Sequence, residues 1–271
     1  MARERARIAQ TMLANCRFCA HDCGVNRLAG DTGLCHAGAE ARFFSAQTEV
    51  SDELELIPTF AVALSGCDMR CDFCITGASS WNPRAGAGFD APAMAAKAGI
   101  ALQKGARTIM VLGGEPTIHL PAALEFVSLL PETARLIWKT NAHGTAPARE
   151  LLDGMFDVWL ADFKFGNDAC AQRLAKTPAY VRVVKENLLW ANEHSELIVR
   201  HLLMPGHVDC CWQPVAEWLA ANLPGVKLNL RSGFWPAWQA ARHAELRRPV
   251  STIENERAAG WAREFGLNLI P

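Results

Sequence analysis

From residue 55 onward, short apolar runs alternate with stretches of helical periodicity. Six runs follow this pattern, at residues 59–66, 106–114, 134–141, 156–164, 196–206 and 226–233. Runs of this length are typical of parallel strands that are buried on both faces, with helices forming the connections between them. The pattern predicts an α/β fold in which helices cover a parallel sheet. Periodicity alone leaves open whether this sheet is doubly wound or part of a (β/α) barrel.

The predicted helices lie between these runs and after the last one. They cover residues 90–104, 120–130, 146–153, 168–192 (as two helices), 211–222 and 253–265. The first residues, MARERARIAQTML, are expected to form a frayed or helical lead-in. They contain arginines but lack the apolar block that follows the basic start of a secretory signal.

Polar side chains occur where the apolar runs end. The carboxyl ends of parallel strands meet at one edge of a sheet, and α/β folds place their chemistry at that edge. We therefore expect a functional site formed by Cys67, Glu115, Lys139 with Asn141, Asp162 with Lys164, His201 and Arg231.

Charge and length narrow the class of protein. The chain has 27 basic and 28 acidic residues, whereas a nucleic-acid carrier normally has a basic excess. No apolar run approaches the roughly 20 residues of a membrane span. We expect a cytoplasmic protein with neither nucleic-acid nor membrane partners. A length of 271 residues allows one large domain with a small appendage. We divide it into a cysteine-rich segment, residues 1–50, and a core domain, residues 51–271.

The chain contains ten cysteines, which are unevenly spaced. A disulfide framework is not expected, because the cytosol keeps thiols reduced. Four lie in residues 16–35 and three in residues 67–74, which indicates metal binding. The remaining three, Cys170, Cys210 and Cys211, are expected to be buried small apolar residues.

The stretch LSGCDMRCDFC places Cys67, Cys71 and Cys74 in one loop after the first apolar run. A cubane of four irons takes four thiolates, so three cysteines leave one iron open to a small molecule. Gly66 permits a tight turn from strand to loop. The alternative is a zinc site that a distant His or Cys completes.

The spacing C-x3-C-x2-C after a strand resembles the radical S-adenosylmethionine (SAM) superfamily. The resemblance implies a partial (β/α)6 barrel and a [4Fe-4S] cluster on these cysteines. It also implies reductive cleavage of SAM to a 5′-deoxyadenosyl radical, which needs a low-potential electron donor such as flavodoxin or ferredoxin. Phe73 matches the aromatic position near adenine. The stretch GGEP, which begins one strand later with Gly113, Gly114 and Glu115, matches the segment that holds the methionine part of SAM.

Two further stretches, ADFKFG (161–166) and VRHLLMPGHVD (199–209), resemble the activating enzymes of glycyl radical enzymes. In that group the matching residues surround SAM, which makes Asp162, Lys164 and His201 candidates for the SAM site. Without the resemblance, Asp162 and Lys164 read as an ordinary ion pair and His201 as a core histidine.

One departure from the activating enzymes concerns KTNAHG (139–144). The activating enzymes carry an Asp in an Asp-Thr-Asn-Gly stretch there, where it helps to bind a monovalent cation. Here Lys139 takes the position of that Asp, and its ammonium repels a cation. We therefore predict no monovalent cation site. Lys139 is a candidate for contacting the SAM carboxylate, and Asn141 for contacting its ribose or carboxylate.

The N-terminal cysteines have the pattern C-x2-C-x3-C-x11-C, at Cys16, Cys19, Cys23 and Cys35. This head resembles the PflX-type group of activase-related proteins. Four such thiolates can close a zinc site or hold a second iron–sulfur cluster. His21 and His36 can substitute as ligands.

The resemblance implies a substrate for the radical but leaves its identity open. A glycine Cα–H of a protein, as in a glycyl radical enzyme, is one candidate. Radical modification of a peptide or a small molecule is an alternative, as is a metal-binding protein without catalysis. The stretch RSGFWPAW (231–238) follows the last run and is either packing or a substrate-entry lip.

Overall fold

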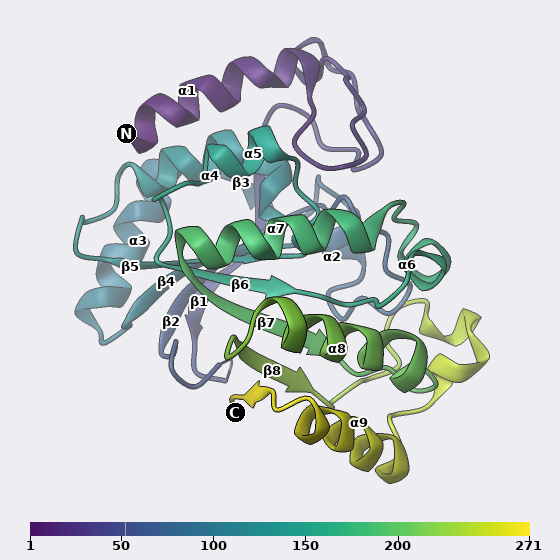
Figure 1. The fold of residues 1–271 in the computed structure, drawn as a ribbon. Coiled ribbons are helices and arrows are strands. Elements are labelled where there is room, and N and C mark those ends of the chain that lie inside the picture. Colours follow the sequence, from purple (N-terminus) through teal and green to yellow (C-terminus); the bar gives the residue numbers. More distant parts are fainter. Residues whose placement is uncertain (52) are drawn as a thin grey trace.

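The computed structural model describes residues 1–51 and 53–271. Its centre is one nine-stranded sheet in the order β3-β1-β2-β4-β5-β6-β7-β8-β9 (Figure 1). Six parallel strands form the middle of this sheet, and they match the six apolar runs: β2 (Thr59–Leu64), β4 (Thr108–Gly113), β5 (Arg135–Thr140), β6 (Val158–Asp162), β7 (Glu196–Leu202) and β8 (Lys227–Arg231). The sheet does not close, because β3 and β9 end it on the two sides. The predicted α/β class and partial barrel are confirmed.

Three strands were not predicted from the sequence. The antiparallel strand β1 (Arg42–Glu49) pairs with β2, and the short β3 (Ala87–Gly88) pairs with β1. The two-residue strand β9 (Asn268–Leu269) adds to β8 in parallel. These strands lie at or near the sheet edges. Edge strands need no continuous apolar run, which explains why the pattern of buried strands missed them.

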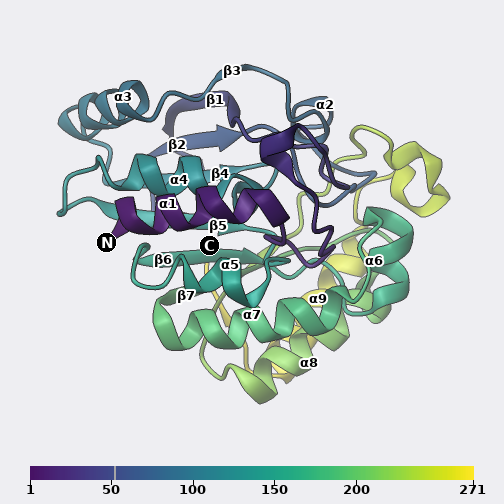
Figure 2. The same ribbon diagram turned by 90° about the horizontal axis from the view of Figure 1, so that it is seen from above.

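Helices surround the outer side of the sheet (Figures 1 and 2). They are α3 (Ala91–Gln103), α4 (Leu120–Val127), α5 (Ala146–Glu150), α6 (Asp168–Ala175), α7 (Tyr180–His194), α8 (Gln213–Asn222) and α9 (Thr252–Glu264). The lead-in is the helix α1 (Ala2–Met12), which packs against α4. In the described part of the chain, no helix is long and apolar enough to cross a membrane. The division between residues 1–50 and 51–271 stays a prediction, although β1 joins the same sheet as the core strands.

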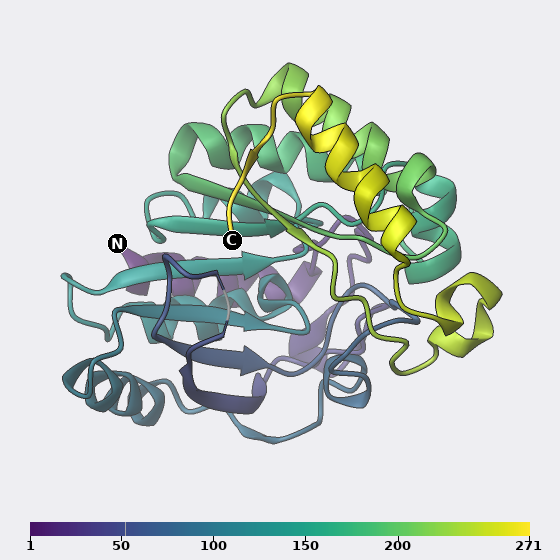
Figure 3. The ribbon, with the colours of Figure 1, turned by 90° about the horizontal axis from the view of Figure 1, so that it is seen from below.

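Alternation along the strands separates two apolar cores. On β6, Trp159 and Ala161 belong to the large core beneath the helices. Val158 and Leu160 point the other way, into a small cluster on the concave side with Leu56, Met110, Ile137 and Ile198. Successive side chains of a strand point to opposite faces, so every second residue reaches the concave side. Figure 3 views this side, with the C-terminal residues in front of the strands.

The parallel register brings the carboxyl ends of the strands to one edge. Leu64 of β2 lies opposite Gly113 of β4, and Asp162 of β6 lies opposite Arg200 of β7. The loops that leave these strands therefore meet above the concave core, as the polar strand ends predict.

Titration of His119 gives one testable consequence for stability. This buried residue ends the 3-10 helix η3 (Pro116–His119), and its Nε2 lies 2.8 Å from the carbonyl oxygen of Ser65. Burial, together with the charge of Arg27, lowers its pKa from 6.5 to about 4. The unfolded chain binds a proton near pH 6.5 while the folded chain does not, so stability falls as the pH drops from 6.5 toward 4. The loss is at most about 3 kcal/mol.

Chemical denaturation as a function of pH checks this expectation. His119→Gln keeps an N–H donor for Ser65 but cannot titrate, so the decline between pH 6.5 and 4 is expected to be smaller than in the wild type. The same substitution at His194, which is exposed on α7, is expected to leave the decline unchanged. Equal declines in wild type and His119→Gln would contradict the assignment.

Candidate functional site

A cavity of about 630 Å³ opens on the concave side at the carboxyl ends of the strands. This volume is within the range of roughly 300–1,000 Å³ that is usual for ligand pockets. Its wall contains most of the residues that the sequence singled out: Cys67, Cys71, Phe73, Cys74, Gly113, Gly114, Lys139, Asn141, Asp162 and Lys164. The structure therefore brings side chains from β2, β4, β5 and β6 and their loops to one hollow, as expected for a site at strand ends.

The cysteine loop begins at Gly66, which has a left-handed φ of 92°. Its middle is held by the far end of α6, because the backbone N–H groups of Arg70 and Asp72 donate to the carbonyl oxygens of Ala175 and Leu174 at 2.8 and 2.9 Å. The thiols thus sit on a loop whose backbone has little freedom to move.

The three thiols of this loop have an environment that suits a cationic metal cluster. Burial raises the pKa of Cys67 well above its ordinary value and that of Cys71 to about 12. A buried thiolate therefore needs a positive partner, which cluster irons would supply. Among the described residues, the groups of potential ligand atoms that gather within 4.8 Å do not include these three cysteines.

The GGEP segment packs its glycines directly on the start of the cysteine loop. A Cβ on Gly114 would lie 2.0 Å from the carbonyl oxygen of Gly66, so only glycine fits there. The Glu115 N–H in turn donates to that Gly66 oxygen at 2.9 Å. The close approach places backbone groups of Gly113 and Gly114 in the cavity wall beside Cys67.

Glu115 itself is buried, and its carboxylate is hydrogen-bonded to other groups of the protein. Its carboxylate accepts hydrogen bonds from the Thr117 N–H at 3.0 Å, the Thr140 hydroxyl at 2.8 Å and the Asn141 N–H at 2.7 Å. Burial and then the nearby charge of Asp68 raise its pKa to about 7. Glu115 thereby ties the end of β5 to the glycine segment and orients Asn141, whereas a direct contact to SAM stays a prediction.

Asp68, directly after the first cluster cysteine, is a residue that sequence reasoning missed. It is fully buried, and its carboxylate accepts from Asn141 Nδ2 at 2.7 Å and from His143 Nδ1 at 3.0 Å. Burial opposes ionisation, but the hydrogen bond and charge of His143 and the hydrogen bond of Asn141 hold its pKa below the ordinary value. The only signal in the sequence was a polar residue between ligands, which is too common to interpret.

Charged groups from the ends of β6 and β7 also line the cavity. Lys164 forms an ion pair with Asp162, whose carboxylate also lies 3.9 Å from Arg200. Arg200 in turn lies 3.0 Å from the buried carboxylate of Glu53. Although burial opposes both charges, the pairing lowers the pKa of Asp162 and raises that of Lys164. Arg200 was missed, although alternation along β7 from Ile198 would have placed it on the concave face.

His201 lies on the opposite face of β7 from Arg200. It is buried against Trp212, and its Nδ1 lies 2.6 Å from the carbonyl oxygen of Phe163. Burial lowers its pKa to about 4, so it is a neutral core histidine. Its predicted contact with SAM gains no support from this position, because the cavity wall takes Arg200 and Leu202 from β7 instead.

The stretch after β8 forms part of the cavity mouth. Phe234 is buried in the wall near Phe73, whereas Trp235 is 72% exposed and also lines the cavity. Trp238 packs edge-on against Trp81, with ring centroids 5.8 Å apart. The stretch therefore packs and also lines the cavity, whereas its role as a substrate-entry lip stays a prediction.

The N-terminal cysteines lie near the site but outside the cavity wall. Cys19 bridges in antiparallel fashion to Gly144, just after β5. His21 Nε2 lies 3.0 Å from the carbonyl oxygen of Asp68, beside His143. Within the described residues, the four cysteines do not gather within 4.8 Å as a single-ion site. Zinc and a second iron–sulfur cluster both stay predictions for Cys16, Cys19, Cys23 and Cys35.

The prediction that the three isolated cysteines are buried apolar residues is wrong for two of them. Cys211 is buried, but Cys170 is only partly buried and Cys210 is exposed. In the folded chain all three cysteines lie next to His207, a residue that was not singled out from the sequence. Cys170 lies 37 positions before His207 in the sequence. No local sequence pattern relates residues so far apart, so this group could be found only in the tertiary structure.

Comparisons with known proteins agree with the site. A family model described as "Radical SAM superfamily" matches residues 62–219, more than half of the chain. The "Uncharacterized protein MJ0674" of Methanocaldococcus jannaschii is 30% identical over 276 residues, which cover 98% of this chain and 79% of that protein. The chain belongs to the radical SAM superfamily, a family that uses a [4Fe-4S] cluster and SAM and needs a reductant.

Solved structures show the same fold. Streptococcus suis SuiB bound to precursor peptide SuiA matches with a TM-score of 0.57 and 14% identity over 75% of this chain. SuiB bound to S-adenosylmethionine matches with a TM-score of 0.56 and 13% identity, also over 75% of this chain. The matches cover 46% and 47% of the SuiB chain, so this chain spans about half of its length. At this identity the likeness is one of fold. The resemblance to the PflX-type group stays a prediction.

The glycine contact gives a testable prediction. Gly114→Ala forces the GGEP segment off the cysteine loop, because the new Cβ overlaps the Gly66 carbonyl. We expect a loss of stability of about 1–3 kcal/mol and a lower iron content after anaerobic reconstitution. Gly99→Ala on α3, where nothing lies within 4 Å of the new Cβ, is the matched control and is expected to be neutral or slightly stabilising. Equal iron content and stability in the two variants would contradict this reading.

Proposed function

We propose that this chain reductively cleaves SAM and uses the resulting radical to abstract hydrogen from a protein or peptide substrate. The observation that carries the proposal is the shared cavity. Three cysteines, two loop glycines and the Asp162–Lys164 pair come from three different strand ends, yet all line one hollow of suitable size for a nucleotide ligand.

In this proposal the cysteines Cys67, Cys71 and Cys74 hold three irons of the cluster. Cys67 and Cys71 are buried and Cys74 is partly buried, and the backbone contacts of the loop hold the thiols in place. When bound, the cluster and SAM supply the electron transfer and the 5′-deoxyadenosyl radical, which no side chain can provide.

The chain's own groups bind and orient SAM. Backbone groups of Gly113 and Gly114 beside Cys67 are suited to the methionine end. Asn141 Nδ2 lies 3.9 Å from Cys67 Sγ, which places its amide at the edge of the cluster position. Lys139 lines the same wall and carries a charge that suits the SAM carboxylate. Asp162 is held ionised by its cationic neighbours and can accept hydrogen bonds from hydroxyl or ammonium groups.

The charged groups at the ends of β6 and β7 give these contacts a rigid base. Asp162, Lys164, Arg200 and Glu53 balance one another's charges in a partly buried site, so the Asp162 carboxylate keeps its position and charge. Phe73, which is buried in the wall, offers an apolar surface for a flat base. Positioning of this kind is what a protein contributes to cofactor radical chemistry.

The cavity mouth supports a peptide as substrate. Trp235 is exposed at the mouth and Arg231 lines it, so an extended chain can meet an aromatic and a cationic side chain there. A glycine Cα–H suits hydrogen abstraction because glycine has no side chain to keep its Cα away from the cavity. A glycyl radical enzyme would present such a glycine. A small molecule that enters the cavity entirely is the alternative.

Anaerobic turnover tests the SAM chemistry. With reconstituted iron–sulfur cluster and dithionite, the wild type is expected to convert SAM to 5′-deoxyadenosine, measured by liquid chromatography. Cys71→Ala removes one thiolate of the wall and is expected to reduce the product to background. Thr11→Ala, at an exposed position of α1 outside the cavity wall, is the control and is expected to retain cleavage.

A chain that binds metal without catalysis would give no 5′-deoxyadenosine in any of these variants, which would refute the proposal. The substrate class is read separately. A peptide or protein substrate is expected to increase 5′-deoxyadenosine and to leave a carbon-centred radical or a modified residue. If cleavage occurs but only small molecules increase it, the peptide assignment is wrong while the SAM chemistry stands.

The position of Lys139 predicts the response to potassium. An ammonium in the cavity wall disfavours a second cation nearby, so adding potassium is expected to change SAM cleavage less than twofold at constant ionic strength. Choline chloride serves as the ionic-strength control. Lys139→Asp restores the Asp-Thr-Asn order and is expected to make cleavage respond to potassium. Strong stimulation of the wild type would contradict the role given to Lys139.

A further inference from the structure

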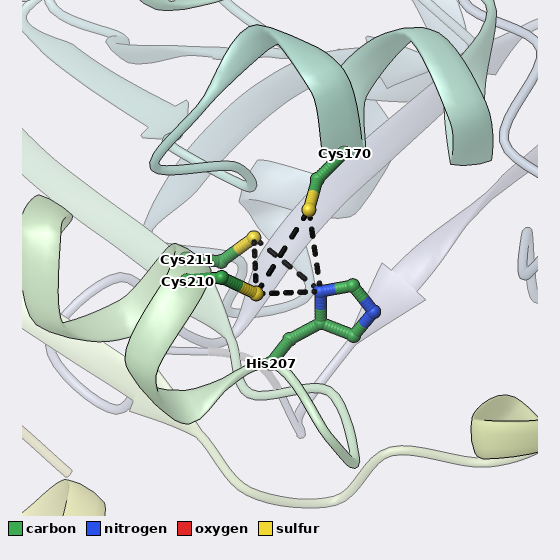
Figure 4. A group of neighbouring side chains, drawn as sticks. All are labelled: Cys170, His207, Cys210 and Cys211. Atoms are coloured by element: carbon green, nitrogen blue, oxygen red, sulfur yellow. Dashed lines mark hydrogen bonds between the residues drawn. The ribbon is translucent and has the colours of Figure 1, made fainter.

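A second group of potential metal ligands lies outside the cavity wall. Cys170 at the start of α6 faces His207, Cys210 and Cys211, which lie in the segment between β7 and α8 (Figure 4). Their four ligand atoms all lie within 4.8 Å of one another. The cysteines are free thiols, and sulfur–sulfur distances of 3.9 Å are far longer than a disulfide bond.

The distances within this group match a tetrahedron around one ion. Zn–S and Zn–N bonds of about 2.3 and 2.05 Å imply tetrahedral edges of roughly 3.8 Å between sulfurs and 3.6 Å between sulfur and nitrogen. The sulfur of Cys210 lies 3.9 Å from the sulfurs of both Cys170 and Cys211. His207 Nδ1 lies 3.6, 3.3 and 3.5 Å from the sulfurs of Cys170, Cys210 and Cys211. These five edges are each within about 0.3 Å of the ideal value, and the sixth, between the sulfurs of Cys170 and Cys211, is no longer than 4.8 Å.

The backbone around the group holds the ligands in this arrangement. Asn167 caps α6 by accepting from the Cys170 N–H at 2.8 Å, and its Nδ2 donates to the Cys210 carbonyl at 2.6 Å. Residues Val208–Trp212 form a turn of π-helix, η4, which brings the adjacent Cys210 and Cys211 to the same side. Wider helical turns of this kind are frequent at functional sites.

His207 is oriented for metal binding through Nδ1. Its ring is buried, and its other nitrogen, Nε2, lies 3.6 Å from the carboxylate of Glu245. Arg173 pairs with the same carboxylate at 2.6 Å and lies 3.3 Å from Nε2. At 3.6 Å the carboxylate is beyond hydrogen-bond distance from Nε2, so it is the short distances from Nδ1 to the three sulfurs that identify His207 as a ligand.

We propose that Cys170, His207, Cys210 and Cys211 bind one zinc ion as a closed structural site. Three thiolates and an imidazole in tetrahedral arrangement are a ligand set that zinc prefers. Four protein ligands leave no open position, so the ion has no catalytic role. The exposed Cys210 gives the ion a route of entry.

The position of the site explains what the ion stabilises. It joins the start of α6 to the segment that follows β7, and the end of α6 holds the cysteine loop through the N–H groups of Arg70 and Asp72. The zinc site thus fixes a helix that supports the loop of Cys67, Cys71 and Cys74. Its effect on the cavity is therefore indirect.

Metal analysis of the full-length protein tests the site. Protein produced with zinc and purified without oxygen is expected to contain one zinc per chain that Cys170→Ser and Cys211→Ser both lose, measured by inductively coupled plasma mass spectrometry. Cys74→Ser, which replaces a cysteine outside this group, is the matched control and is expected to keep that zinc. Equal zinc content in all variants would overturn the proposal.

If a variant fails to fold, anomalous diffraction from wild-type crystals tests directly whether zinc is bound at this site. Data collected on the two sides of the zinc absorption edge are expected to show a peak among Cys170, His207, Cys210 and Cys211. Zinc in the sample with a peak only at the N-terminal cysteines would refute the site, as would iron at this position. The readout does not depend on SAM cleavage, so it stands or falls separately from the proposed function.

Discussion

Backbone hydrogen bonds around the cysteine loop are the contacts on which the site depends most. From one side, the N–H groups of Gly114 and Glu115 donate to the carbonyl oxygens of Leu64 and Gly66, each at 2.9 Å. From the other side, the last turn of α6 accepts the N–H groups in the middle of the loop. Side chains alone cannot hold three thiols on an irregular loop, because a free loop loses several kcal/mol of conformational entropy when it orders. The backbone contacts meet this cost during folding, before any cofactor binds.

Charge compensation is the second condition for the cavity. Asp162, Lys164, Arg200 and Glu53 bring alternating charges together on the concave side, and each is less costly to bury because its neighbour is opposite in sign. In the cysteine loop, burial raises the pKa of Cys67, and it raises that of Cys71 by more than the nearby charge of Lys164 lowers it, so these thiols stay protonated without a further cation. One side of the cavity is thus electrostatically complete, while the other is suited to a positively charged cluster. The proposed zinc site, at the start of α6, likewise gathers thiols that a bound cation would stabilise as thiolates.

The six parallel strands and the cysteine loop could be predicted because both leave local signals. A strand buried on both faces must be apolar throughout, and three ligands within eight residues are visible as spacing. Strand β1, which lies next to the edge strand β3, left no such signal, because its residues are only half-buried or exposed. Arg200 and His201 are neighbours on opposite faces of β7, and which of the two faces looks into the cavity depends on the curvature of the whole sheet.

The sequence by itself determined the six central strands, the longer helices between them, the family and the clustering of three cysteines in one loop. These follow from periodicity and from spacing along the chain, which act over a few residues. Only the tertiary structure decided that Glu115 and Asp68 serve as hydrogen-bonding supports, and that Cys170 lies within reach of Cys210, 40 positions away. The reason is physical. A contact between distant residues depends on the register of the strands and the packing of the helices between them, and no local pattern encodes either.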